Sequence, residues 1–157
     1  LTGSAMITDE LKQYAKKTAV YIRVKAYQDE PYFLDNNAKL KPEEKKSAQK
    51  GIVPFAGIAK PQRFFEMIKS NNYNGISHVA FSDHHNYDRN DIEKILRICK
   101  EKNCKYIATT EKDATKLMNF TNRFTANGIK CLVFPISLKI SEGSIEFFNL
   151  LKLSLLK

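Results

Sequence analysis

The chain has 157 residues, enough for one globular domain with a hydrophobic core of its own. Hydrophobic residues make up 43% of it, which excludes a disordered chain, and no apolar run approaches the ~18 residues that span a bilayer. The net charge of +9 comes largely from scattered lysines, which favours a solvated basic surface, with an anionic partner as the alternative.

The three cysteines have no C-x-x-C spacing, so we expect buried free thiols rather than a zinc site. The start of the sequence shows no signal peptide, and we expect a soluble chain. Because it begins at Leu1 rather than at Met, we expect it to be part of a longer protein.

The first expected elements in chain order are a helix, a strand and a loop. Thr8 or Asp9 can cap a short helix that ends near Lys17. Alternating hydrophobicity over residues 20–27 predicts a strand. Residues 28–50 are polar and rich in Lys and Glu, and they include two prolines, so we predict a loop there.

From residue 51 onward, short apolar runs alternate with helical patterns. Pro61 suits the first turn of a helix, because its missing N–H has no partner at that position. The alternation predicts one α/β domain over residues 1–157, with three α/β/α layers and a mainly parallel sheet of about five strands. The expected strands are 52–56, 76–81, 104–108 and 130–134, and the expected helices are 61–70, 88–102, 112–120 and one from Ser141 or Ser144 nearly to Lys157.

Three polar clusters each follow one of these strands. They begin at Gly57, at Asp83 and at Thr109. Because the carboxyl ends of parallel strands lie along one edge of a sheet, we expect the three clusters to converge there on one site.

Asp83, His84 and His85 form the sharpest of the three clusters. Histidine titrates near neutral pH, and a neighbouring carboxylate can orient the ring and raise its basicity. A histidine at a strand end can equally form a structural hydrogen bond, and we interpret His78, inside the strand pattern, in that way.

The other two clusters are less specific. Glu111 and Asp113 suit a helix start, where acidic side chains are favoured by the helix dipole, whereas Lys112 between them needs a carboxylate or a ligand nearby. Gly57 permits close approach of the backbone, and Lys60 and Arg63 follow it at the same edge. No segment matches the phosphate-binding pattern G-x-x-x-x-G-K-[ST].

Taken together, the clusters resemble a known family. The segments FAGIAKPQRFF, FSDHH and TTEKDATKL, at residues 55–65, 81–85 and 109–117, are similar in order and spacing to the C-terminal half of tetraacyldisaccharide 4'-kinase, the lipid A kinase of Gram-negative bacteria. The resemblance extends from about residue 51 to residue 157. It implies transfer of the ATP γ-phosphate to the 4'-hydroxyl of tetraacyldisaccharide 1-phosphate.

The resemblance also implies roles for residues. His84 and Asp83 are the expected catalytic pair of this half, with His84 reaching across a cleft to support the catalytic Asp of the other half. His85 matches a position where the family also accepts Gln. His85, Lys60, Arg63, Glu111, Lys112 and Asp113 are the expected substrate- or cleft-facing residues.

ATP and Mg are the cofactors that the resemblance implies for the full-length kinase, and we expect this chain to bind neither alone and to be inactive alone. The implied partners are the lipid A precursor, the missing N-terminal kinase half and a membrane surface, without nucleic acid. The implied location is the cytoplasmic face of the bacterial inner membrane.

Two other functions stay open at this point. A metal-dependent phosphoesterase of the D-H-H kind fits Asp83-His84-His85, but Lys60, Arg63 and Lys112 at the other strand ends would repel a metal ion. A basic module that binds nucleic acid or acidic membrane fits the net charge, but the chain has no strand face that interleaves aromatic and basic residues.

Overall fold

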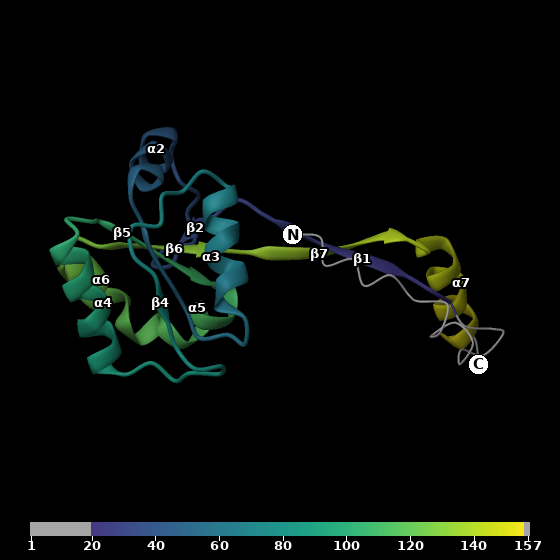
Figure 1. Ribbon diagram of the computed structural model, residues 1–157. Coiled ribbons are helices and arrows are strands. Elements are labelled where there is room, and N and C mark those ends of the chain that lie inside the picture. The colour runs from purple at the N-terminus through teal and green to yellow at the C-terminus, as the bar shows by residue number, and fades with distance from the viewer. Residues whose placement is uncertain (1–19, 156–157) are drawn as a thin grey trace. The chain divides into compact units, whose positions relative to one another are not determined.

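A computed structural model describes residues 20–155 (Figure 1). The expected helix between Thr8 and Lys17 lies outside the described residues. The backbone contacts divide the chain into two units, which we describe separately. We call residues 28–135 the core unit, and residues 20–27 together with 136–155 the ribbon unit. The prediction of one domain over residues 1–157 stays a prediction.

The core unit contains a five-stranded sheet with the order β2-β6-β5-β3-β4. Four neighbouring strands are parallel, and only β2 pairs with its neighbour β6 in the antiparallel direction. The mainly parallel sheet of about five strands is therefore confirmed. The strands are β2 (Tyr32–Phe33), β3 (Val53–Ala56), β4 (Val79–Ala80), β5 (Tyr106–Thr110) and β6 (Lys130–Phe134).

Alternate residues along the central strands enter two separate apolar clusters, as the period of two in a strand requires. In β3, Val53 and Phe55 pack with buried residues of α4 (Arg89–Glu101), α5 (Glu111–Leu117) and α6 (Thr121–Ala126). Ala56 packs instead with α2 (Pro42–Lys50) and α3 (Pro61–Ser70). Both sides of β3 are buried, which explains its uninterrupted apolar sequence. The three-layer arrangement stays a prediction.

Two expected helices are confirmed, together with the local signals that predicted them. Helix α3 starts with Pro61 in its first turn and buries Phe64, Met67 and Ile68. Helix α4 is capped by Asp88, whose side chain accepts a hydrogen bond from the backbone N–H of Asp91, while the side chain of Asp91 accepts one from the N–H of Asp88.

The prediction of a loop over residues 28–50 is wrong for much of that segment, because it contains β2 and the nine-residue α2. Pro42, which we took as a loop signal, occupies the first turn of α2. Glu44 accepts a hydrogen bond from the backbone N–H of Lys41 and forms an ion pair with Lys130 of β6. The helix is weakly amphipathic and buries only Ala48.

Other boundaries differ from the prediction. Strand β4 is only two residues long instead of six, although Gly75 also bridges to Ile52 beside β3. The helix expected to continue to Phe120 ends at Leu117 and passes through a 3-10 turn, η1 (Met118–Phe120), into the unpredicted α6. Strand β5 is shifted two residues toward the C-terminus.

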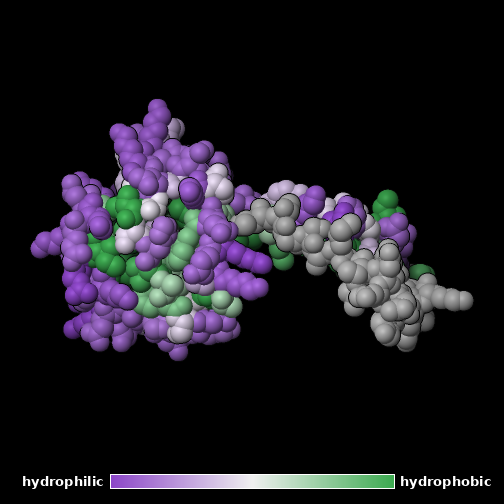
Figure 2. All heavy atoms as spheres, in the orientation of Figure 1, coloured by the Kyte–Doolittle hydropathy of each residue, from purple (hydrophilic) through white to green (hydrophobic). Residues whose placement is uncertain are grey.

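The ribbon unit consists of a two-stranded sheet and a helix. Strand β1 (Arg23–Gln28) pairs with β7 (Ile136–Glu142), which the sequence analysis missed, and Arg23 forms an ion pair with Glu142. Helix α7 (Ser144–Leu155) begins at one of the two predicted serines. None of its residues is buried, although most of them are apolar, and hydrophobic side chains are visible on the surface of this unit in Figure 2.

Candidate functional site

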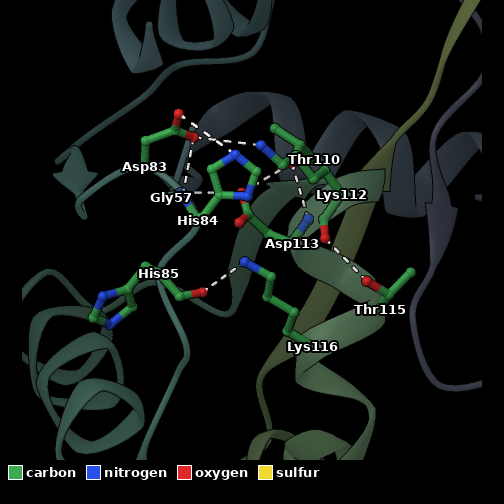
Figure 3. A network of polar contacts seen from close by, with 9 residues as sticks. All are labelled: Gly57, Asp83, His84, His85, Thr110, Lys112, Asp113, Thr115 and Lys116. Carbon is green, nitrogen blue, oxygen red and sulfur yellow. Dashed lines mark hydrogen bonds and ion pairs between the residues drawn. The ribbon is translucent and has the colours of Figure 1, made fainter. Parts of the chain in front are cut away.

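Three segments that follow β3, β4 and β5 meet at the carboxyl edge of the sheet (Figure 3). They meet because β3 lies between the other two strands and runs parallel to both. The backbone N–H of Gly57 donates to Asp113 Oδ2 at 3.0 Å, and Lys112 Nζ donates to Asp83 Oδ1 at 3.3 Å. These contacts confirm the predicted convergence of the three clusters. The roles of the residues remain predictions.

Asp113 is the buried centre of this arrangement. It is fully buried, and its Oδ2 accepts hydrogen bonds from the Gly57 N–H and from the Thr110 hydroxyl at 2.9 Å. Thr110 in turn caps α5 by accepting from the Asp113 N–H. We expected Asp113 to face the cleft, and the structure places it inside the protein instead. A buried carboxylate requires such donors, and they join the ends of β3 and β5.

Gly57 permits the close packing around Asp113. A Cβ atom on residue 57 would lie 2.9 Å from the Cβ of His85, which is closer than Cβ atoms come in proteins, and 3.2 Å from the Tyr87 hydroxyl, which is a tight contact. Burial, and then the nearby charge of Asp113, raise the pKa of Tyr87 far above its usual value. The backbone approach expected from the glycine is therefore an approach to the protein's own side chains.

Asp83 and His84 occupy a tight turn after β4. The turn is closed by a hydrogen bond from the His85 N–H to the Ser82 carbonyl at 3.2 Å, and His84 lies in the left-handed region with φ of 57°. Asp83 Oδ1 accepts from the His84 N–H at 2.9 Å. Its other oxygen, Oδ2, is 3.8 Å from His84 Nε2.

The charge state of Asp83 follows from these contacts. Desolvation acts to raise the pKa of Asp83, but hydrogen bonds from Lys112 and from the His84 N–H outweigh it and lower that pKa below its usual value. Asp83 is therefore a carboxylate at neutral pH. The His84 side chain is 76% exposed, so its imidazole is available to another molecule.

His85 differs sharply from His84. Its Nε2 lies 2.7 Å from Asp91 Oδ2, its Nδ1 lies 3.3 Å from the Ser82 hydroxyl, and its ring stacks on Phe81. The backbone carbonyl of His85 accepts a hydrogen bond from Lys116 Nζ at 2.7 Å. Only 25% of the side chain is exposed, and the contacts of its ring hold the turn in place. The expected contact of His85 with a substrate remains a prediction.

Sequence reasoning missed three residues that build this site: Tyr87, Asp91 and Lys116. Two of them carried a signal. Asp91 stands three residues after the cap Asp88, and Lys116 follows Lys112 by one helical turn, so both lysines extend from one side of α5. Nothing in the local sequence indicated that Tyr87 would reach Asp113.

Lys60, Arg63 and Glu111 are exposed at the same edge but are not brought into contact with the turn. Within the described residues, the side chains of Lys60 and Arg63 form no hydrogen bond or ion pair. Glu111 lies near β2, where burial and then its charge raise the pKa of Tyr32. Their expected contact with a substrate remains a prediction.

The arrangement does not favour a D-H-H metal site. Asp83 is engaged by the Lys112 ammonium, and the two histidine rings have different partners. Among residues 20–155, no group of three His, Cys, Asp or Glu side chains is placed to hold a metal ion. Cys99, Cys104 and Cys131 are buried free thiols, as expected.

Comparison with known proteins shows a match to one protein family. Residues 2–153 match the family model described as tetraacyldisaccharide-1-P 4'-kinase. Two curated proteins named tetraacyldisaccharide 4'-kinase, from Rickettsia typhi and Rickettsia canadensis, are 36% and 32% identical over 102 residues. The matched segment is 65% of this chain but only 30% of each relative.

A solved structure, that of LpxK from Aquifex aeolicus in complex with ATP, is 14% identical with a TM-score of 0.46. The match covers 76% of this chain and 32% of that protein. The chain thus spans less than half the length of the proteins it resembles.

Proposed function

Because the chain belongs to the tetraacyldisaccharide-1-P 4'-kinase family, we propose that it is the C-terminal part of a kinase for the lipid A precursor. The complete kinase would transfer the ATP γ-phosphate to the 4'-hydroxyl of tetraacyldisaccharide 1-phosphate. The observation that carries the proposal is the Asp83–His84 turn. It presents an exposed imidazole at the carboxyl edge of the sheet, where α/β proteins bind their ligands.

Phosphoryl transfer needs groups that cradle the phosphates, hold Mg²⁺ and orient the attacking hydroxyl. The chain has no G-x-x-x-x-G-K-[ST] segment, and its described acidic residues do not cluster as metal ligands. The residues present therefore do not fit ATP and Mg²⁺ by themselves. We assign both to the part of the kinase outside residues 1–157, together with the carboxylate that acts as base.

His84 would support that base from across the cleft. An imidazole can donate a hydrogen bond to a carboxylate and so hold it in the orientation that accepts the proton of the attacking hydroxyl. Asp83 Oδ2 lies 3.8 Å from Nε2 of His84, so the carboxylate is beside the ring that would donate. Lys112 holds Asp83 in this position, so that two side chains orient one ring.

The missing half is also the partner that the ribbon unit would contact. Helix α7 exposes Ile145, Phe148, Leu153 and Leu155, and its apolar residues are spread around the whole helix. A helix that is apolar on all sides is buried in a larger protein, whereas a helix lying on a membrane keeps one charged face. We therefore propose that α7 packs against the kinase half.

Because the substrate is a lipid, we expect the complete kinase to act at the cytoplasmic face of the bacterial inner membrane. It would be a peripheral protein or be anchored through another part of the polypeptide. No helix in residues 20–155 has the length and apolar character to cross a bilayer.

Steady-state kinetics of the complete kinase, with ATP and lipid varied separately, test the proposal. We expect His84→Ala to lower kcat by about 100-fold, as the loss of a proton-transfer support does, while the KM for ATP stays the same. His78→Ala is the matched control, because His78 is also exposed but contacts Phe65 on another part of the core unit. A wild-type kcat for His84→Ala would refute the assigned role.

A further inference from the structure

We infer that Lys116 is a positioning residue for His84, a role that rests on the proposed function. Among residues 20–155, no hydrogen bond or ion pair joins Lys116 to the His84 imidazole. Its Nζ donates a hydrogen bond to the carbonyl oxygen of His85, 31 residues earlier in the chain, at 2.7 Å. Through that carbonyl it fixes the peptide between His85 and Asn86, which begins one residue after His84.

The turn needs such a restraint because its conformation is unfavourable. A histidine in the left-handed region, as at φ of 57°, is sterically strained, and the strain persists only where surrounding contacts outweigh it. Lys112 restrains the turn before His84, through Asp83. Lys116 restrains it after His84, so the two lysines bracket the exposed ring (Figure 3).

Helix α5, which carries both lysines, is held firmly in the core unit and can therefore restrain the turn. Its start is capped by Thr110, and Asp113, Ala114 and Leu117 are buried in the core unit. Lys112 and Lys116 are four residues apart and therefore extend from the same side of the helix. The position of the turn is thus set by a helix whose own position is set by the core.

The hydrogen bond of Lys116 is of the strong kind, since a charged donor at this distance binds a carbonyl more tightly than a neutral one. Without it the turn would not unfold, because the His85 ring stays bound to Asp91 and stacked on Phe81. What changes is the freedom of the His84 backbone. The loss is therefore expected in kcat, where a displacement of a supporting group by a fraction of an ångström matters.

The test is a double-mutant cycle in the complete kinase. Lys116→Met keeps the apolar stem and removes the donor, and we expect kcat to fall about tenfold with an unchanged KM for ATP. Lys116→Arg keeps a donor and should retain kcat within about threefold. If Lys116 acts through His84, the double variant Lys116→Met/His84→Ala should be no slower than His84→Ala alone.

Lys105→Met is the matched control, because Lys105 is exposed at the opposite end of β5 and should keep the wild-type kcat. Circular dichroism checks folding, and Lys116→Leu takes the place of Lys116→Met in the cycle if that variant does not fold. Two results would overturn this inference and leave the proposed function standing. One is a wild-type kcat for Lys116→Met while His84→Ala is impaired, and the other is a double variant in which the two losses multiply. Wild-type kcat for His84→Ala would overturn the proposed function and this inference with it.

Discussion

His84 and His85 are neighbours in sequence with opposite surroundings. The ring of His85 is held by Asp91, Ser82 and Phe81, whereas that of His84 stands in solvent on a strained backbone. A strained non-glycine residue at a ligand-binding edge is typical of a residue kept for its side chain rather than for stability. The contrast between the two rings supports the role that we propose for His84.

The strain at His84 leads to a prediction about stability. His84→Gly removes the Cβ that makes the left-handed conformation costly, whereas His84→Ala keeps it. In urea unfolding of this chain, we expect the glycine variant to be more stable than the alanine variant by about 1 kcal/mol. In the complete kinase both variants should lose the same activity, since both lack the ring. Equal stability of the two variants would contradict a left-handed His84.

At the scale of elements, the start of α4 is tied to the turn through one carboxylate. Asp91 Oδ2 accepts from the Asp88 N–H at 3.0 Å and lies 2.7 Å from His85 Nε2. Burial acts to raise the pKa of Asp91, but these hydrogen bonds outweigh it and lower the pKa below 3.8. The helix cap and the His85 ring therefore depend on the same ionised group.

This coupling predicts a pH dependence. A carboxyl group whose pKa is lower in the folded state contributes stability above its unfolded pKa, near 4, and loses it as the pH falls through the folded pKa. At pH 7, Asp91→Asn should therefore be less stable than wild type by about 1–2 kcal/mol. The difference should shrink below about pH 4.

Urea unfolding at pH 7, 5, 4 and 3 measures this difference. Glu66→Gln, on the exposed side of α3, is the control, and it should follow the wild-type curve throughout. A destabilisation by Asp91→Asn that stays constant from pH 7 to pH 3 would show that the carboxylate charge is not what matters.

At the scale of the whole molecule, the two units differ in how well they bury their apolar residues. The core unit buries two apolar clusters around its sheet. The ribbon unit has a helix without a buried residue. Under the proposed function, the core unit holds its own turn in place, and another part of the kinase would cover α7 and supply the nucleotide site.

The corresponding prediction concerns the isolated chain. Residues 1–157 should fold but should neither bind ATP tightly nor phosphorylate the disaccharide, because they contain no phosphate-binding loop. Isothermal titration with MgATP and a lipid kinase assay measure this, with the complete kinase as the positive control. Micromolar ATP binding or turnover by the isolated chain would refute the assignment of the nucleotide to the other half.

Much of the fold was determined by local sequence. The apolar runs at β3 and β6, the proline that starts α3 and the aspartate that caps α4 are signals that act within a few residues, and they predicted a mainly parallel α/β sheet. The order of polar clusters after the strands also predicted where they would meet. Helix α2 was missed because its apolar face is weak, and part of its support, Lys130, lies 86 residues away.

The inside of the site was decided by tertiary structure alone. Asp113 and Glu111 look alike as acidic residues at a helix start, but only Asp113 is turned inward, where its Oδ2 accepts hydrogen bonds from the Gly57 N–H and the Thr110 hydroxyl. Lys116 can bond to the His85 carbonyl, and His85 can contact Asp91, only after β3, β4 and β5 are paired. Sequence spacing records which groups stand at strand ends, whereas the direction of each side chain depends on the packing of segments that are distant in the chain.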